Sequence, residues 1–172
     1  DDEPQIYLID PSGGEARRLT RLATGCASLR WFPDGKRIAF VSWVWPELRT
    51  DAQQAKRLKA RKDDKVKAHV TERAEYRFWD HWLTDGRAPH VFVVDIGSGR
   101  CRDALAGTGL ALPPWDPSAD DFDIAPDGRE IAITADLAPE PAMMNQTDIV
   151  VVDLASRRKR VLTAATKMAD AH

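Results

Sequence analysis

One twelve-residue pattern occurs twice in this chain, at residues 29–40 and 122–133. Each copy places a Pro-Asp-Gly turn between two short runs of β-forming residues. A second, apolar pattern that ends in aspartate follows at residues 90–95 and 148–153, and it also occurs at residues 5–10. A short internal repeat of this kind predicts a fold built from repeated structural units.

Each repeat is typical of four consecutive β-strands. The Pro-Asp-Gly tripeptide predicts a turn between the first two strands, because proline fixes its φ angle, aspartate bonds to nearby backbone and glycine accepts a positive φ. The third strand is the apolar run that ends in Asp10, Asp95 or Asp153. A loop and a basic strand that closes on leucine follow it, at residues 16–20, 101–105 and 158–163. Four antiparallel strands per repeat form the blade of a β-propeller.

The repeats divide the chain into two complete units and one half unit. We expect an all-β fold, a partial β-propeller of about two and a half four-stranded antiparallel blades with one helical insertion. The expected parts are a half blade at 1–24, a full blade at 25–108, a second full blade at 109–164 and a tail at 165–172. Because a propeller typically closes with roughly four to eight blades, we expect an arc cut at both ends, whose open blade faces favour self-association.

The first full unit carries an insertion at residues 43–89. Its centre, residues 46–75, is rich in Ala, Lys, Arg, Glu and Gln, which predicts a helix with Pro46 at its first position. The basic stretch at 57–67 is interpreted as a solvated helix face rather than an interaction patch.

An aromatic cluster follows the predicted helix and contains Tyr76, Phe78, Trp79 and Trp82. Its spacing fits neither a strand nor a helix stripe, so we expect an ordered loop whose rings dock on the edge of the blade. This interpretation predicts that Trp79 is largely buried. The alternative is that Trp79 and Trp82 line a ligand site, and both are candidate substrate-binding residues.

The composition of the chain limits the classes of partner that we expect it to bind. A net charge of −2 over 172 residues points to neither nucleic acid nor an anionic membrane. No apolar run approaches the roughly 18 residues of a membrane span. The two cysteines, Cys26 and Cys101, are expected to be free buried thiols, with a disulfide as the alternative. The sequence leaves the compartment open between the cytoplasm and the periplasm of a bacterium.

The sequence lacks the patterns that assemble a catalytic site. Gly97-Ser98-Gly99 does not have the spacing of a nucleophile elbow, and no phosphate-binding or dinucleotide-binding loop occurs. The four histidines share no metal-ligand spacing, and the pair Asp80-His81 is interpreted as a structural hydrogen bond. We expect this chain to carry no catalytic residue, no metal and no cofactor.

With these residues considered together, the sequence resembles the propeller domain of the prolyl oligopeptidase family. The resemblance is to its bacterial dipeptidyl-peptidase and acylaminoacyl-peptidase-like members. The doubled Pro-Asp-Gly phrase is shared with periplasmic TolB-type propellers. The more specific segments are 78–82 with 86–87 and 90–95, and 112–115 leading to 120–128 and 145–153.

In that family the catalytic serine, aspartate and histidine lie in a separate C-terminal α/β-hydrolase domain, which the propeller covers so that only small peptides enter. The resemblance therefore implies a non-catalytic propeller segment of a serine peptidase. Its implied partners are the hydrolase domain and the remaining blades of the same parent protein, together with a peptide substrate.

Dipeptidyl-peptidase relatives bind the amino terminus of the substrate through acidic and polar side chains of propeller loops. Asp136, Glu140 and Asn145 are candidates for this role, because they lie in a polar segment predicted to be a loop at 136–147. The alternative function is that of a fragment of a TolB-type protein-interaction propeller. The aromatic insertion favours the peptidase, since plain interaction propellers have more even repeats.

Overall fold

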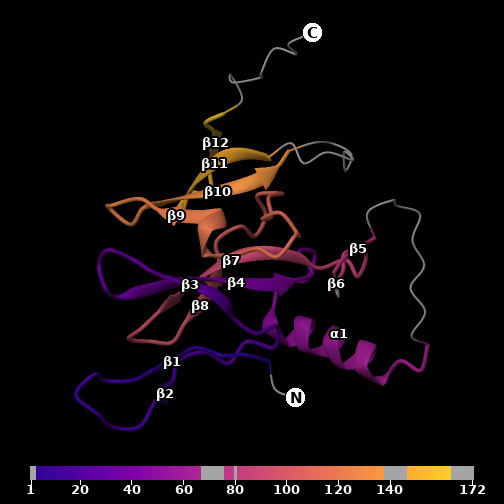
Figure 1. Ribbon diagram of the computed structural model, residues 1–172, viewed down its shortest axis with the longest axis horizontal. Helices are drawn as coiled ribbons and strands as arrows, with labels where there is room; N and C mark the ends of the chain where they lie inside the picture. Colours follow the sequence, from indigo (N-terminus) through magenta and orange to yellow (C-terminus); the bar gives the residue numbers. More distant parts are fainter. Residues whose placement is uncertain (1–2, 67–75, 80, 138–146, 164–172) are drawn as a thin grey trace.

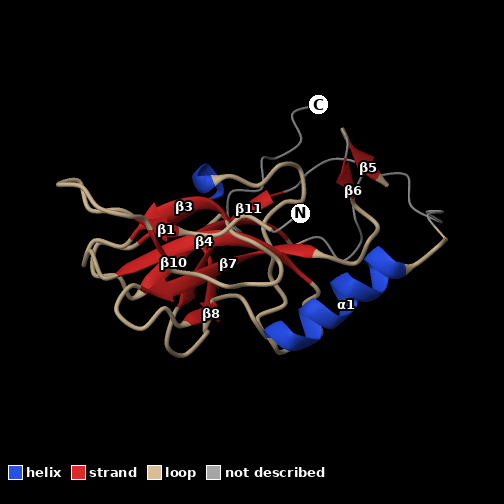
Figure 2. Ribbon diagram, turned by 90° about the horizontal axis from the view of Figure 1, so that it is seen from below, coloured by secondary structure: helices blue, strands red, loops and turns tan. Residues whose placement is uncertain are grey.

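The described part of the chain is built around antiparallel sheets that follow the order of the sequence repeats. The computed structural model describes residues 3–66, 76–79, 81–137 and 147–163. Three sheets lie one above another (Figure 1). Within these ranges the fold is mostly β, with one α-helix that lies beside the sheets (Figure 2).

The first layer is a two-stranded sheet of β1 (Tyr7–Leu8) and β2 (Arg17–Arg18). The middle layer contains, side by side and in this order, β3 (Ala27–Trp31), β4 (Arg37–Val44), β7 (Ala88–Asp95) and β8 (Cys101–Asp103). The third layer contains, in order, β9 (Phe122–Ile124), β10 (Glu130–Asp136), β11 (Thr147–Asp153) and β12 (Lys159–Val161). The remaining described elements are α1 (Asp51–Asp63), the hairpin of β5 (Arg77–Phe78) and β6 (His81–Trp82), and a 3-10 helix, η1 (Ala119–Asp121).

Both four-stranded layers are up-and-down sheets in which every strand is antiparallel to its neighbours. This confirms the four-strand unit that the repeats predict. The two Pro-Asp-Gly turns form alike: the glycine N–H donates to the carbonyl three residues earlier, at 3.0 Å from Gly35 and 2.8 Å from Gly128. Both glycines have a positive φ, 65° and 66°, which explains why glycine occupies this place in each copy.

The middle layer is buried on both of its faces. On β4, Ala39 and Val41 face the core shared with the third layer, whereas Ile38 and Phe40 face the core shared with the first layer. The sequence of β4 is therefore apolar almost without interruption. By contrast, β10 alternates buried and half-buried residues, because only one of its faces is covered.

Helix α1 begins later than its composition predicts. Thr50 is the N-cap, with its hydroxyl accepting the Gln53 N–H at 3.3 Å while the Gln53 side chain accepts the Thr50 N–H at 3.1 Å. This reciprocal pair fixes the start at Asp51, so the expectation that Pro46 opens the helix is wrong. The helix ends at Asp63, and residues 67–75, which the composition also assigned to it, lie outside the described residues.

The helix is attached to the sheet mainly through polar groups. Gln54 is its one buried residue, and its amide both accepts from the Trp45 N–H at 3.1 Å and donates to the Trp45 carbonyl at 2.9 Å. In this way the side chain pairs with the backbone that follows β4 much as a neighbouring strand would. Apolar side chains contribute little to this attachment, because Leu58 of the helix and Leu48, which precedes it, are only half-buried.

Trp45 is the centre of this attachment. Its ring is 1% exposed, and its indole N–H donates to the Asp85 carbonyl at 3.0 Å. The Asp85 carboxylate, 4% exposed, pairs with Arg61 of the helix at 2.9 Å and with Arg87 at 2.7 Å. Both guanidinium groups also lie near the Trp45 ring, 5.9 and 5.8 Å from its centre. The indole, one carboxylate and two arginines thus join the helix to the turn that precedes β7.

A second repeated feature stabilises the loop after each third strand. The carboxylates of Asp10, Asp95 and Asp153 each accept hydrogen bonds from the hydroxyl and the backbone N–H of a nearby serine, at 2.6–2.8 Å. These bonds lower the pKa of all three carboxyls below the ordinary value of 3.8. The serine hydroxyl lowers the pKa most at Asp10 and Asp95, and the serine N–H does so at Asp153.

We predict that acid destabilises the chain through these three turns. A carboxyl whose pKa is lower in the folded state adds stability above its unfolded pKa and loses it as the pH falls through the folded value. The unfolding temperature should therefore decline below about pH 4, and Asp95→Asn should lower it at neutral pH while flattening the acid decline. The measurement is thermal unfolding followed by circular dichroism across the acid range. Asp116→Asn is the matched control, because its exposed carboxylate makes no described hydrogen bond or ion pair; an equal effect there would contradict the assignment.

Candidate functional site

The described residues among the predicted substrate-binding candidates lie in different parts of the structure. Trp79 and Trp82 lie on the small hairpin of β5 and β6, whereas Asp136 lies in the third layer. Asp136 is the last residue of β10 and pairs with Thr147, so the strands extend to both ends of the segment predicted as a loop. Glu140 and Asn145 lie outside the described residues.

The hairpin holds four aromatic residues and one arginine, and we call it the aromatic hairpin: Tyr76, Arg77, Phe78, Trp79 and Trp82. Its strands pair through Phe78 with His81 and Arg77 with Trp82, and the Leu83 N–H donates to the Tyr76 carbonyl at 3.0 Å. The Tyr76 and Trp82 rings lie 6.0 Å apart at 31°. The cluster is therefore a hairpin with ring contacts across its strands, not the irregular loop that its spacing predicts.

The prediction that Trp79 is largely buried is wrong. Its side chain is 83% exposed, and its backbone has φ = 49° at the turn between the two strands. Tyr76 and Trp82 are also partly open, at 45% and 37%. The Trp79 ring makes an edge-on contact with the Phe78 ring, with 6.5 Å and 87° between them. The anchoring role that the sequence assigned to Trp79 belongs to Trp45.

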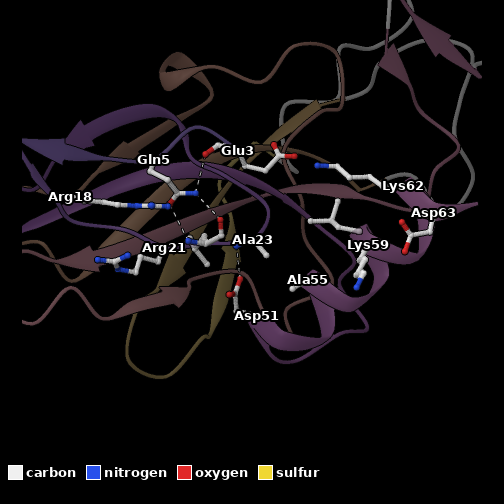
Figure 3. Close-up of a pocket in the computed structure, with 12 residues that line it drawn as sticks. Glu3, Gln5, Arg18, Arg21, Ala23, Asp51, Ala55, Lys59, Lys62 and Asp63 are labelled. Atoms are coloured by element: carbon white, nitrogen blue, oxygen red, sulfur yellow. Dashed lines mark hydrogen bonds between the residues drawn. The ribbon is translucent and has the colours of Figure 1, made fainter. Parts of the chain in front are cut away.

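A polar cleft of about 440 Å³ lies between the segment after β2 and helix α1 (Figure 3). Gln5 holds one wall, because its amide donates to the Leu22 carbonyl at 2.7 Å and accepts from the Leu22 N–H at 3.0 Å. Asp51 closes the lower end by accepting the Ala23 N–H at 2.9 Å. The charged side chains that line the cleft are of both signs: Arg18, Arg21, Lys59, Lys62, Glu3, Asp51 and Asp63. This lining suits a polar ligand, and no local pattern in the sequence joins its two distant walls.

A second cleft, of about 510 Å³, lies between the start of α1 and the outer strand β8. Cys101 is one of its lining residues. Burial raises the pKa of this thiol to about 11, with a smaller contribution from Cys26, so the sulfur is protonated at neutral pH and is a poor nucleophile. Burial likewise raises the pKa of Cys26. Both cysteines are free, as expected, but only Cys26 is buried, whereas Cys101 is half-buried.

The described residues contain one buried histidine paired with a carboxylate. Nδ1 of His90 lies 2.8 Å from Oδ2 of Asp103, and the other oxygen of Asp103 accepts the Leu105 N–H at 2.8 Å. No serine or cysteine side chain in the described ranges is hydrogen bonded to His90, so the pair lacks the nucleophile of a catalytic triad. The Asp80-His81 pair cannot be compared, because Asp80 and the His81 side chain lie outside the described residues.

The described residues contain no group of three or more His, Cys, Asp or Glu side chains placed to hold a metal ion. Nor do they include a helix with both the length and the apolar character that crossing a membrane requires.

No protein-family model matches the sequence. Two curated proteins do. The chain is 28% identical to dipeptidyl-peptidase 5 of Porphyromonas endodontalis over 179 aligned positions, which is 99% of this chain and 24% of that protein. It is 26% identical over 152 positions to the uncharacterized peptidase YuxL of Bacillus subtilis, which is 88% of this chain and 21% of that protein. The chain is related to peptidases. It spans about a quarter of the length of these relatives.

A solved structure extends the comparison to the fold. The acylaminoacyl peptidase of Pyrococcus horikoshii superposes with a TM-score of 0.56 at 14% identity, over 92% of this chain and 21% of that one. At this identity the match concerns the fold alone, and it covers all three sheet layers rather than a single repeat.

Substitutions of Trp45 and Trp79 should distinguish a tryptophan that anchors the fold from one that is exposed on the surface. Trp45→Ala removes a fully buried indole and should destabilise the chain by about 3–5 kcal/mol, enough to unfold much of it. Trp79→Ala removes an exposed ring and should change the free energy of unfolding by about 0.5 kcal/mol or less. Urea unfolding followed by circular dichroism measures both. If the two variants lose equal stability, the Trp79 ring is packed, which contradicts its exposure on the surface.

Proposed function

We propose that this chain is a non-catalytic propeller segment of a serine peptidase of the prolyl oligopeptidase family. In the parent protein it covers the hydrolase domain and helps to admit or hold small peptides. One observation carries the proposal: the alignment with dipeptidyl-peptidase 5 runs over 99% of this chain, and the described residues within that stretch form stacked antiparallel sheets. Stacked four-stranded sheets of this kind are the blades of propellers.

The described chemistry supports a binding role rather than a catalytic one. His90 has a carboxylate partner and no hydroxyl or thiol nucleophile, and burial keeps the Cys101 thiol protonated. The polar cleft and the aromatic hairpin present charged and aromatic side chains on the surface. Two relatives named as peptidases also favour this function over a TolB-type interaction propeller.

The test of the proposal is a matched pair of proteins, the full reading frame that contains this chain and residues 1–172 alone. Both are incubated with chromogenic dipeptide substrates and with N-acylated aminoacyl substrates. We expect the full-length protein to hydrolyse one of the two classes and to be stopped by a serine-directed inhibitor, whereas residues 1–172 show no turnover. Inhibitor-sensitive turnover by residues 1–172, or an inert full-length protein, would contradict the proposal.

Asp136 offers a sharper test of substrate anchoring in the full-length protein. If its carboxylate holds the free amino terminus of a peptide, Asp136→Asn should raise KM for free-amine substrates about tenfold, because the negative charge that pairs with the ammonium group is lost. KM for N-acylated substrates should stay unchanged, since these lack the ammonium group. An equal rise for both classes would assign Asp136 a structural role at the end of β10.

A further inference from the structure

Two features of Trp79 are energetically unfavourable, its backbone conformation and the exposure of its ring. Its φ of 49° lies in the left-handed region, which is unfavourable for a bulky side chain and is normally occupied by glycine, asparagine or aspartate in tight hairpin turns. Its indole is also 83% exposed, so a large apolar ring stays in contact with water. Packing against the described residues offsets little of this, because the ring contact given for Trp79 among them is the edge-on one with Phe78, and most of the indole stays exposed. An unfavourable conformation held at an exposed aromatic residue is a reason to look for a ligand.

The described neighbouring side chains extend the exposed aromatic surface and add a positive charge to it. Tyr76 and Trp82 lie side by side with their rings 6.0 Å apart, and both are partly exposed. The Arg77 guanidinium lies 5.6 Å from the centre of the Trp82 ring and forms no ion pair with any described residue. Because this cation already occupies the face of Trp82, the surface disfavours cationic ligands and favours a carboxylate beside an apolar group.

The size of the surface selects the kind of ligand. Large aromatic side chains bury about 150–250 Å² each, so the exposed fractions of Tyr76, Trp79 and Trp82 amount to roughly 250–400 Å². A stable protein–protein interface needs about 800 Å² from each partner. The aromatic hairpin is thus too small to hold a second copy of this chain or another folded protein by itself. It matches the contact area of one or two residues of a peptide.

We propose that the aromatic hairpin binds peptides that carry an aromatic side chain next to a carboxylate. The aromatic side chain stacks on Trp79, and the carboxylate pairs with Arg77. The inference rests on the proposed function to the extent that such a peptide is a substrate or product of the parent peptidase. It adds to that function a ligand class and a contact residue.

Binding is tested on the 172-residue chain by isothermal titration calorimetry. The probe is the blocked peptide Ac-Gly-Phe-Glu-Gly-amide, compared with peptides in which Ala replaces Phe or Lys replaces Glu. We expect saturable binding of the first peptide only. Trp79→Gly should weaken it at least about tenfold without unfolding the chain, because glycine accepts the positive φ. Arg77→Gln should abolish the preference for Glu over Lys.

Trp31→Ala is the matched control, since Trp31 is a second exposed tryptophan, 55% open, on a different element, β3. It should leave the affinity unchanged. The inference is overturned if the Phe-Glu peptide does not bind at millimolar concentration or if Trp31→Ala weakens binding as much as Trp79→Gly. It is also overturned if sedimentation shows self-association that Trp79→Gly removes, because the hairpin would then bind a second copy. In each case inhibitor-sensitive hydrolysis by the full-length protein would leave the proposed function standing.

Discussion

The fold depends on the burial of the middle sheet from both sides. Each fully buried aliphatic or phenyl side chain contributes roughly 1.5–3 kcal/mol, and β4 and β7 supply such side chains to both of their faces. The first layer, a two-stranded sheet, has little stability of its own. It is held because Ile6 and Leu19 enter the core on one side of the middle sheet. The third layer covers the other side with the buried residues of β9, β10 and β11.

The insertion follows a different physical rule. Helix α1 exposes nearly all of its residues and is held by hydrogen bonds and charge around one indole, that of Trp45. A polar attachment of this kind is specific in geometry but leaves the surface of the helix free for other contacts. Helix α1 also forms one wall of the polar cleft. The insertion therefore contributes charged side chains to this surface. The aromatic hairpin, which follows the helix in the sequence, likewise carries exposed side chains on an element outside the three stacked sheets.

Much of the fold follows from the sequence because the governing interactions are local. The Pro-Asp-Gly turns lie within short windows and form as expected. The two-residue alternation of β10 and the aspartate–serine turns are equally local in sequence. The start of α1 was missed because composition predicts helix content, whereas Thr50 and Gln53 together decide where the helix begins. The signal was present, since a threonine followed three residues later by glutamine is a capping box.

The candidate site was less predictable, because burial depends on distant contacts. Residue type alone favours burial of Trp79 and of Trp45 equally, so it does not distinguish the two. One local clue did exist: Trp45 directly follows the apolar run of β4, while Trp79 stands among charged neighbours. The polar cleft brings Gln5 and Arg18 against α1 across a large sequence separation, and no spacing rule relates them. Asp136 was assigned to a loop because strand ends are poorly marked in a polar segment.

The pairing of Val44 with Ala88 has a kinetic consequence. The insertion leaves the middle sheet from β4 and returns to the strand beside it, so this pair closes a loop of residues 45–87. In the third layer, Asp136 and Thr147 close residues 137–146, a loop about four times shorter. The entropic cost of closing a loop grows by about 0.6 kcal/mol for each doubling of loop length. Pairing β4 with β7 therefore costs roughly 1.2 kcal/mol more than pairing β10 with β11. We expect the β10–β11 pair to form first during folding, and pulse-labelling hydrogen exchange would show the order. The sheet that supplies most of the final stability would then be the later one to assemble.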